Sequence, residues 1–174
     1  MGIPLKSNIF KQGTREQRYF ARFPIQVAVL FSPDDRKFVE AFREIFLNLD
    51  QLTGDHVAFF AVLDPPADWI NAARNREWWR EYQGYIAQAG FFYNDSVLMA
   101  EIARLFRVAW SSLPSIVVGT NLWTGERVIF PTLVWDIERQ LEALTRLARE
   151  WGKPNIDHIY QTLNELIGSE GENF

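Results

Sequence analysis

Cysteine is absent from the 174-residue sequence. Without thiols the chain can form no disulfide, no thiolate metal site and no thiol nucleophile, whether its compartment is reducing or oxidising. The sequence also has no run of about 18 apolar residues, the length needed to span a bilayer. Its N-terminus carries several basic residues but no apolar core of a secretory signal. We therefore expect a cytoplasmic protein with no membrane partner.

A strong excess of charge is also lacking. The chain has 18 basic and 22 acidic residues and a formal net charge of −4. This balance gives little general attraction to phosphate backbones, so we expect no nucleic-acid partner. The two histidines, His56 and His158, have no neighbours at metal-ligand spacing, and neither a glycine-rich phosphate loop nor a Gly-x-Ser-x-Gly nucleophile elbow occurs. No metal site, cofactor or catalytic residue is predicted.

What the sequence does have is enough apolar material for one domain with a sizeable core. Its length and its 48% hydrophobic residues favour one domain with additions. Thr14 and Gln17 have the spacing of a capping box and predict a short helix near the N-terminus. We place an N-terminal extension at 1–24, the domain at 25–151 with an insert at 65–93, and a C-terminal helix with a disordered tail at 152–174.

The start of this domain has the pattern of a strand–helix–strand unit. Residues Ile25 to Phe31 form a nearly continuous apolar run, which is typical of a strand buried on both faces. From Asp35 to Leu52, apolar residues recur at three- and four-residue spacing and indicate a helix. A second apolar run, His56 to Leu63, follows it. Two buried strands joined by a helix predict a parallel pair with a right-handed crossover.

The rest of the chain combines helices with one hairpin. Two apolar segments, Ser115 to Thr120 and Glu126 to Phe130, flank a loop that ends in Gly125, and they predict an antiparallel hairpin. Helices are expected on both sides of it, at Asp68 to Ala89, at Ser96 to Val108, from a Thr132 cap to Trp151, and from an Asn155 cap onward.

This order of elements, together with Leu113-Pro114-Ser115 before the hairpin, resembles the thioredoxin-like superfamily. The resemblance covers roughly residues 25–151 and implies a three-layer α/β fold, with a central mixed sheet of about four to five strands and helices on both faces. The chain adds an aromatic helix in the insert and an extra C-terminal helix. In the superfamily a cis proline precedes the hairpin strand, and Pro114 matches it. The redox dithiol corresponds to Ser32–Asp35, so this chain resembles a redox-inactive member.

The resemblance implies binding in place of redox chemistry. Members that lack cysteines commonly act as adaptors, escorts or chaperones, and by that analogy this chain recognises a protein or peptide partner. The groove beside the cis proline would be lined by Pro33, Leu113, Pro114 and Ser115. Leu113 would offer its backbone to an extended peptide strand.

Two other interpretations of the turn after the first buried strand stay open. Ser32 could donate its hydroxyl to a bound thiolate, as in glutathione-binding relatives of this fold, which would make the chain an enzyme that binds glutathione or another thiol compound. Asp34 and Asp35, with Asp64 after the next strand, could bind Mg²⁺ at the carboxyl ends of the parallel strands. Against both, Ser32 or Asp34 could cap the following helix, and Asp64 before Pro65 is typical of a turn.

Aromatic residues are the other candidates for partner binding. The segment Asp68 to Ala89 combines Trp78 and Trp79 with arginines, and these residue types anchor many protein interfaces. Adjacent residues point about 100 degrees apart on a helix, so one of the two tryptophans can be exposed. We predict Trp78, Trp79 and Trp110 as apolar contacts for a partner. The alternative is that this helix packs its aromatic side chains on the domain.

The C-terminal helix offers a surface for self-association. Four apolar residues form one stripe along it: Ile156, Ile159, Leu163 and Leu166. A homodimer through this helix is therefore a further expectation.

Overall fold

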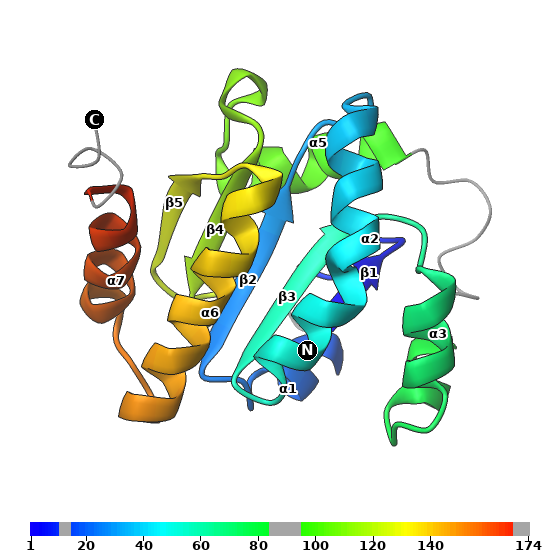
Figure 1. Ribbon diagram of the computed structural model, residues 1–174, viewed down its shortest axis with the longest axis horizontal. Helices are drawn as coiled ribbons and strands as arrows, with labels where there is room; N and C mark the ends of the chain where they lie inside the picture. The colour runs from blue at the N-terminus through cyan, green and yellow to red at the C-terminus, as the bar shows by residue number, and fades with distance from the viewer. Residues whose placement is uncertain (11–14, 84–94, 169–174) are drawn as a thin grey trace.

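A five-stranded mixed sheet forms the centre of the molecule (Figure 1). The computed structural model describes residues 1–10, 15–83 and 95–168. The strands lie in the order β1-β3-β2-β4-β5, where β1 and β2 run parallel to β3, and β4 is antiparallel to both β2 and β5. The predicted α/β fold, parallel unit and hairpin are confirmed. The strand bounds are β1 (Gly2–Leu5), β2 (Ile25–Leu30), β3 (Val57–Val62), β4 (Ser115–Gly119) and β5 (Arg127–Pro131).

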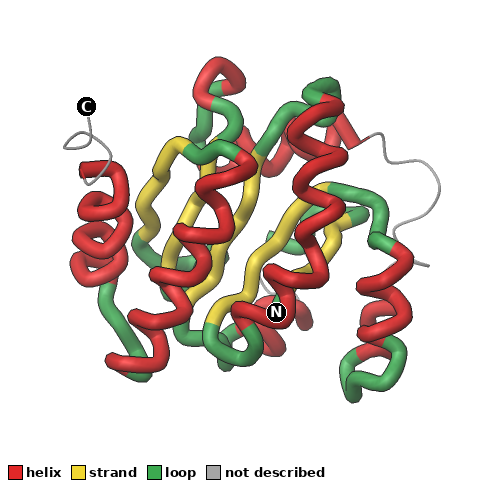
Figure 2. Tube along the Cα trace, viewed as in Figure 1, coloured by secondary structure: helices red, strands yellow, loops and turns green. Residues whose placement is uncertain are grey.

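Helices pack on both faces of this sheet. Helices α2 and α6 lie side by side over one face, and α7 packs against α6 and the outer strand β5 (Figures 1 and 2). Helix α5 contacts β3. The bounds are α1 (Arg15–Phe20), α2 (Arg36–Thr53), α3 (Ala67–Ala73), α5 (Asp95–Phe106), the 3-10 turn η1 (Trp110–Ser112), α6 (Val134–Trp151) and α7 (Ile156–Gly168).

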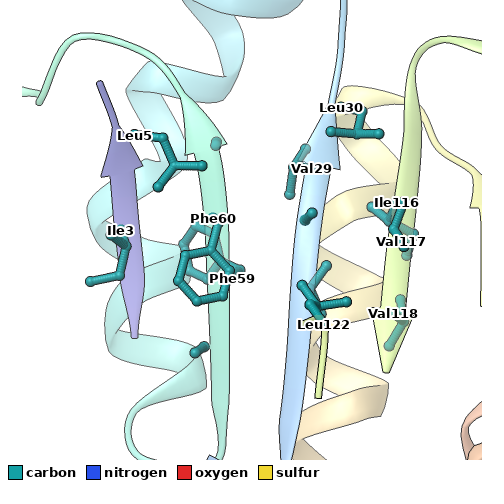
Figure 3. Close-up of a cluster of buried hydrophobic side chains, with 14 of the residues drawn as sticks. Ile3, Leu5, Val29, Leu30, Phe59, Phe60, Ile116, Val117, Val118 and Leu122 are labelled. Carbon is teal, nitrogen blue, oxygen red and sulfur yellow. The ribbon is translucent and has the colours of Figure 1, made fainter. Parts of the chain in front are cut away.

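Two consecutive phenylalanines of β3 pack on opposite faces of the sheet. Successive side chains of a strand point to opposite faces. The ring centroid of Phe59 lies 5.1 Å from that of Phe46 in α2, whereas the centroid of Phe60 lies 5.4 Å from Phe10 and 4.9 Å from Phe20. All five side chains are buried. Figure 3 shows Phe59 and Phe60 among apolar neighbours from the adjacent strands. The strands predicted to be buried on both faces are buried on both faces.

Edge strand β1 has no counterpart among the predicted elements. Gly2 lies opposite Phe59 in the parallel register, and a Cβ at Gly2 would lie 2.5 Å from Cζ of Phe59. The amide of Gly2 donates a hydrogen bond to Oδ1 of Asp50 at 2.8 Å. The segment predicted as an N-terminal extension at 1–24 therefore contributes a strand to the central sheet.

The aromatic insert packs beside β1 and is not one helix. Helix α3 ends at Ala73, residues 74–78 form turns, and residues 79–83 are helical again. Trp69 is fully buried, with its ring centroid 6.1 Å from that of Phe46. The hydroxyl of Tyr82 donates to the carbonyl of Pro4 at 3.1 Å. The remainder of the predicted aromatic helix, at 84–89, lies outside the described residues, as do Thr14 of the predicted capping box and the predicted tail at 169–174.

The starts of the last two helices test two predicted caps. The Asn155 cap is confirmed, because its Oδ1 accepts the amide of His158 at 2.9 Å. The Thr132 cap is wrong. Thr132 is buried, and its hydroxyl donates to Oε1 of Gln140 at 2.6 Å, while Leu133 occupies the N-cap of α6. The helix begins at Val134, so Thr132 stands one residue before the N-cap position.

Candidate functional site

A groove of about 740 Å³ opens beside the Leu113–Pro114 peptide bond, which is cis. Its walls come from the turn before β4, from β5, from the start of α6 and from the end of α7 (Figure 1). The chain segments that meet here are far apart in sequence. The lining residues used below are Leu113, Pro114, Ser115, Ile129, Leu133 and Ile167.

Apolar side chains on the groove walls stay accessible to solvent. The exposed fractions of Ile129, Leu133 and Ile167 are 45%, 44% and 44%. Side chains alternate along β5, so Ile129 points away from the face on which its neighbour Phe130 packs against Tyr160 of α7, at 5.6 Å between ring centroids. Accessible apolar side chains gathered in one concave place are typical of a binding surface.

The three buried polar side chains along the groove are bonded within the chain. The hydroxyl of Thr132 donates to Gln140, and the Gln140 amide donates to the carbonyl of Pro131 at 3.1 Å. The hydroxyl of Ser115 donates to the carbonyl of Ser112. A ligand in this groove would therefore meet apolar side chains more than polar groups in need of a partner.

The backbone around Pro114 is partly engaged as well. The N–H of Leu113 donates to the carbonyl of Trp110 at 3.2 Å, and the carbonyl of Pro114 accepts the N–H of Thr132 at 3.1 Å. An extended peptide could therefore bond to Leu113 through its carbonyl oxygen and not through its N–H. The predicted position of Leu113, Pro114 and Ser115 in a groove agrees with the structure, and Trp110 stands just before it in η1 with 46% of its surface exposed.

The turn between β2 and α2 lies outside this groove. Asp35 caps α2, because its Oδ1 accepts the amide of Phe38 at 3.2 Å, so the expected caps Ser32 and Asp34 are wrong. The hydroxyl of Ser32 accepts the amide of Asp34 at 3.3 Å. Ser32 and Pro33 are half-buried, and Asp34 and Asp35 are exposed. None of these four residues lines the groove, so the expectation that Pro33 lines it together with Leu113, Pro114 and Ser115 is wrong for Pro33.

The acidic residues considered for Mg²⁺ have other roles. Asp35 caps α2, and Asp64 forms an ion pair with Lys6, which also approaches Asp95 at 3.4 Å. Over residues 1–10, 15–83 and 95–168, no group of three His, Asp or Glu side chains is placed to hold a metal ion. The geometry gives the Mg²⁺ interpretation no support.

Trp78 and Trp79 belong to the core of the insert. Their rings contact those of Trp69 and Tyr82 at centroid distances between 5.6 and 6.3 Å. Trp78 is buried and Trp79 is half-buried. The prediction that Trp78 contacts a partner is therefore corrected in favour of packing on the domain, whereas a partner contact of half-buried Trp79 stays a prediction. A row of aromatic side chains looks the same in sequence whether it faces a core or a partner.

The C-terminal apolar stripe is likewise used inside the chain. Ile159 and Leu163 are 0% and 1% exposed, and Ile156 and Leu166 pack against the same core. Helix α7 packs against α6, β4 and β5. A homodimer that needs the stripe accessible is therefore not compatible with this fold.

Sequence reasoning missed Ile129, Leu133 and Ile167. The one usable signal was alternation along β5, which separates Ile129 from Phe130. Leu133 and Ile167 lie at helix ends, where periodicity does not say which side a residue faces.

None of the helices in the described part of the chain has both the length and the apolar character to cross a bilayer. Comparison with family models, with curated proteins and with solved structures finds no match for this chain.

Proposed function

We propose that the chain is a thioredoxin-like binding module without redox activity, and that it holds an extended segment of a protein partner in the groove beside Pro114. The sheet order β1-β3-β2-β4-β5, with a parallel β1-β3-β2 part and an antiparallel β4-β5 hairpin, supports the thioredoxin-like assignment. The absence of cysteine removes dithiol exchange from such a fold. Binding is the function left to such a scaffold.

The observation that carries the proposal is the accessible apolar wall of the groove. Ile129, Leu133 and Ile167 each keep close to half of their surface in water. Covering the exposed half of one such side chain is worth about 1 kcal/mol. The buried polar side chains of Ser115, Thr132 and Gln140 already have partners, so covering them adds little desolvation cost.

The backbone geometry favours an extended partner segment. The groove runs beside β5, which is an edge strand of the sheet. Edge strands present unpaired backbone groups to an added strand, and alternate side chains of that strand can enter pockets on one side. The carbonyl of Leu113 provides one further acceptor.

Peptides selected from a displayed random library against this chain test the proposal, with affinity then measured by titration. Leu133→Asp should weaken binding of the selected peptide by roughly tenfold or more, since a loss of 1.4 kcal/mol is tenfold. Leu133 is the N-cap of α6, and aspartate is a favoured N-cap residue, so this variant should stay folded.

A matched control is Val97→Asp in the first turn of α5, which is 59% exposed and outside the groove. It should leave the peptide affinity unchanged. Failure to select any binding peptide, or equal affinities of the wild type and Leu133→Asp, would show that this groove is not a peptide site. Circular dichroism of each variant shows whether its fold is retained.

A further inference from the structure

A second cavity, of about 440 Å³, lies between α1, strand β1 and the aromatic insert. Its volume is within the range of small-molecule sites. The residues that line it differ from those of the groove beside Pro114, so the two places are separate. Five of its lining residues are buried and mainly apolar: Ile3, Ile9, Phe20, Trp78 and Tyr82.

Contacts with the rest of the fold hold the walls of this cavity in place. The hydroxyl of Tyr82 donates to the carbonyl of Pro4 in β1 at 3.1 Å, and its ring centroid lies 5.6 Å from that of Trp78. On the α1 side, the ring centroid of Phe20 lies 4.9 Å from that of Phe60 in β3. Protein interiors are closely packed, so a cavity of this size between fixed apolar walls is typical of a preformed ligand site.

Four charged residues also line this cavity, with one acid and one base on each of two walls. Arg15 and Glu16 belong to α1, and Arg80 and Glu81 belong to the insert. Arg15 donates to Glu81 at 2.6 Å, and both side chains are exposed. Within the described part of the chain, neither Glu16 nor Arg80 forms an ion pair or a side-chain hydrogen bond. One carboxylate and one guanidinium therefore line the cavity without a partner.

We propose that this cavity binds a free α-amino acid with an apolar side chain. Glu16 accepts hydrogen bonds from the ammonium group of the ligand, and Arg80 donates two parallel bonds to its carboxylate. The apolar side chain of the ligand lies among the rings of Phe20, Trp78 and Tyr82. The two charges of an amino acid thus bridge two residues that do not pair with each other. This inference is independent of the function proposed for the groove beside Pro114.

The charges of the cavity favour this class of ligand over simpler ones. A ligand with only a carboxylate would be attracted by Arg80 but repelled by Glu16, and a ligand with only an ammonium group would meet the opposite pair of effects. A neutral apolar molecule would leave both charges without a partner. Aromatic rings attract one another in edge and offset contacts, so phenylalanine is the best first probe for walls that contain three rings.

Titrations of the full chain with three phenyl compounds, followed by amide chemical shifts, test this inference. L-Phenylalanine carries both charges, 3-phenylpropionate carries only the carboxylate, and phenethylamine carries only the ammonium group. Phenylalanine should bind with a dissociation constant below about 1 mM. It should bind at least about tenfold more tightly than either of the other two compounds. Absence of phenylalanine binding at millimolar concentration, or equal affinities of the three compounds, would overturn the inference.

Substitution of each charged residue should affect one end of the ligand. Arg80→Gln should weaken the binding of phenylalanine about tenfold and should not weaken that of phenethylamine, which has no carboxylate. Glu16→Gln should weaken the binding of phenylalanine to a similar extent and should not weaken that of 3-phenylpropionate. Arg80 is exposed and Glu16 is half-buried, so both variants should stay folded, which circular dichroism checks.

Two control variants separate this site from its surroundings. Arg74→Gln removes another exposed arginine of the insert that does not line the cavity, so it should leave the affinity for phenylalanine unchanged. Leu133→Asp should do the same, because Leu133 belongs to the groove beside Pro114. Equal losses in Arg80→Gln and Arg74→Gln, or weaker phenylalanine binding in Leu133→Asp, would refute the assigned site.

Discussion

Removing the guanidinium of Arg76 should destabilise the fold through the buried carboxylate that it leaves behind. The side chain of Asp50 is 0% exposed, and Arg76 donates to both of its oxygens, at 3.0 Å to Oδ1 and by a second, shorter bond to Oδ2. Oδ1 also accepts the amide of Gly2. This one carboxylate therefore joins the end of α2, the edge strand β1 and the aromatic insert.

The size of this destabilisation depends on whether another cation balances the carboxylate charge of Asp50. The Met1 amino group lies nearby, but burial lowers its pKa from 8.0 to about 5, with Asp50 opposing that shift, so the amine is mostly neutral at pH 7. Arg76 is then the main cation facing Asp50. Removing one partner of a buried ion pair lowers the free energy of unfolding by about 3 to 5 kcal/mol. The Arg76 side chain is 30% exposed, which favours the lower end of this range. Loss of the Arg76 contact over the Trp78 ring, at 5.7 Å, adds about 0.5 kcal/mol.

Arg76→Met should therefore lower the free energy of unfolding by about 3 kcal/mol. For a chain of this size the midpoint of thermal unfolding should fall by about 6 to 12 °C. Urea titration followed by circular dichroism and tryptophan fluorescence measures the first quantity, and a thermal scan the second. Arg76→Lys, which keeps the charge but not the two-pronged bonding, should fall between wild type and Arg76→Met.

Two controls separate pairing from general damage. Arg146→Met removes an exposed arginine from its pair with Glu142 and should cost less than about 0.5 kcal/mol. In an Asp50→Asn background the carboxylate charge is gone, so Arg76→Met should cost less than about 1 kcal/mol there. An equal cost of Arg76→Met in both backgrounds, or a cost no larger than that of Arg146→Met, would refute the reasoning.

Two further substitutions test the packing around the central sheet. Gly2→Ala places a methyl group 2.5 Å from the Phe59 ring and should destabilise the chain by about 1 to 3 kcal/mol, whereas Gly168→Ala, with nothing within 4 Å, should not. Equal urea midpoints for these two variants would contradict the tight register of β1. Gln26→Leu should cost about 2 to 4 kcal/mol, because the buried Gln26 amide accepts the N–H of Leu122 and donates to the last carbonyl of α1. A urea midpoint of Gln26→Leu at or above that of wild type would show that these backbone groups find other partners.

Several elements were determined by the sequence alone. The apolar runs Ile25 to Phe31 and His56 to Leu63 leave no polar face to turn toward water, so they must become strands covered on both sides. The apolar stripe that begins after Asp35 permits one helix in one orientation. The loop ending at Gly125 joins strands close enough in sequence to pair as a hairpin. In each case the deciding information lies within about 20 neighbouring residues, where periodicity acts.

The tertiary structure decided what depends on distant partners. The segment Gly2–Leu5 is too short to show a hydrophobic periodicity. It becomes a strand because β3 has an open edge and Asp50 accepts a hydrogen bond from the Gly2 amide. Trp78 is buried because Trp69 and Tyr82 surround it, which no local pattern states. The groove exists because segments more than 50 residues apart, from Leu113 to Ile167, meet beside Pro114. Local sequence fixes which side chains must avoid water, and only the packed chain decides which of them remain exposed for a partner.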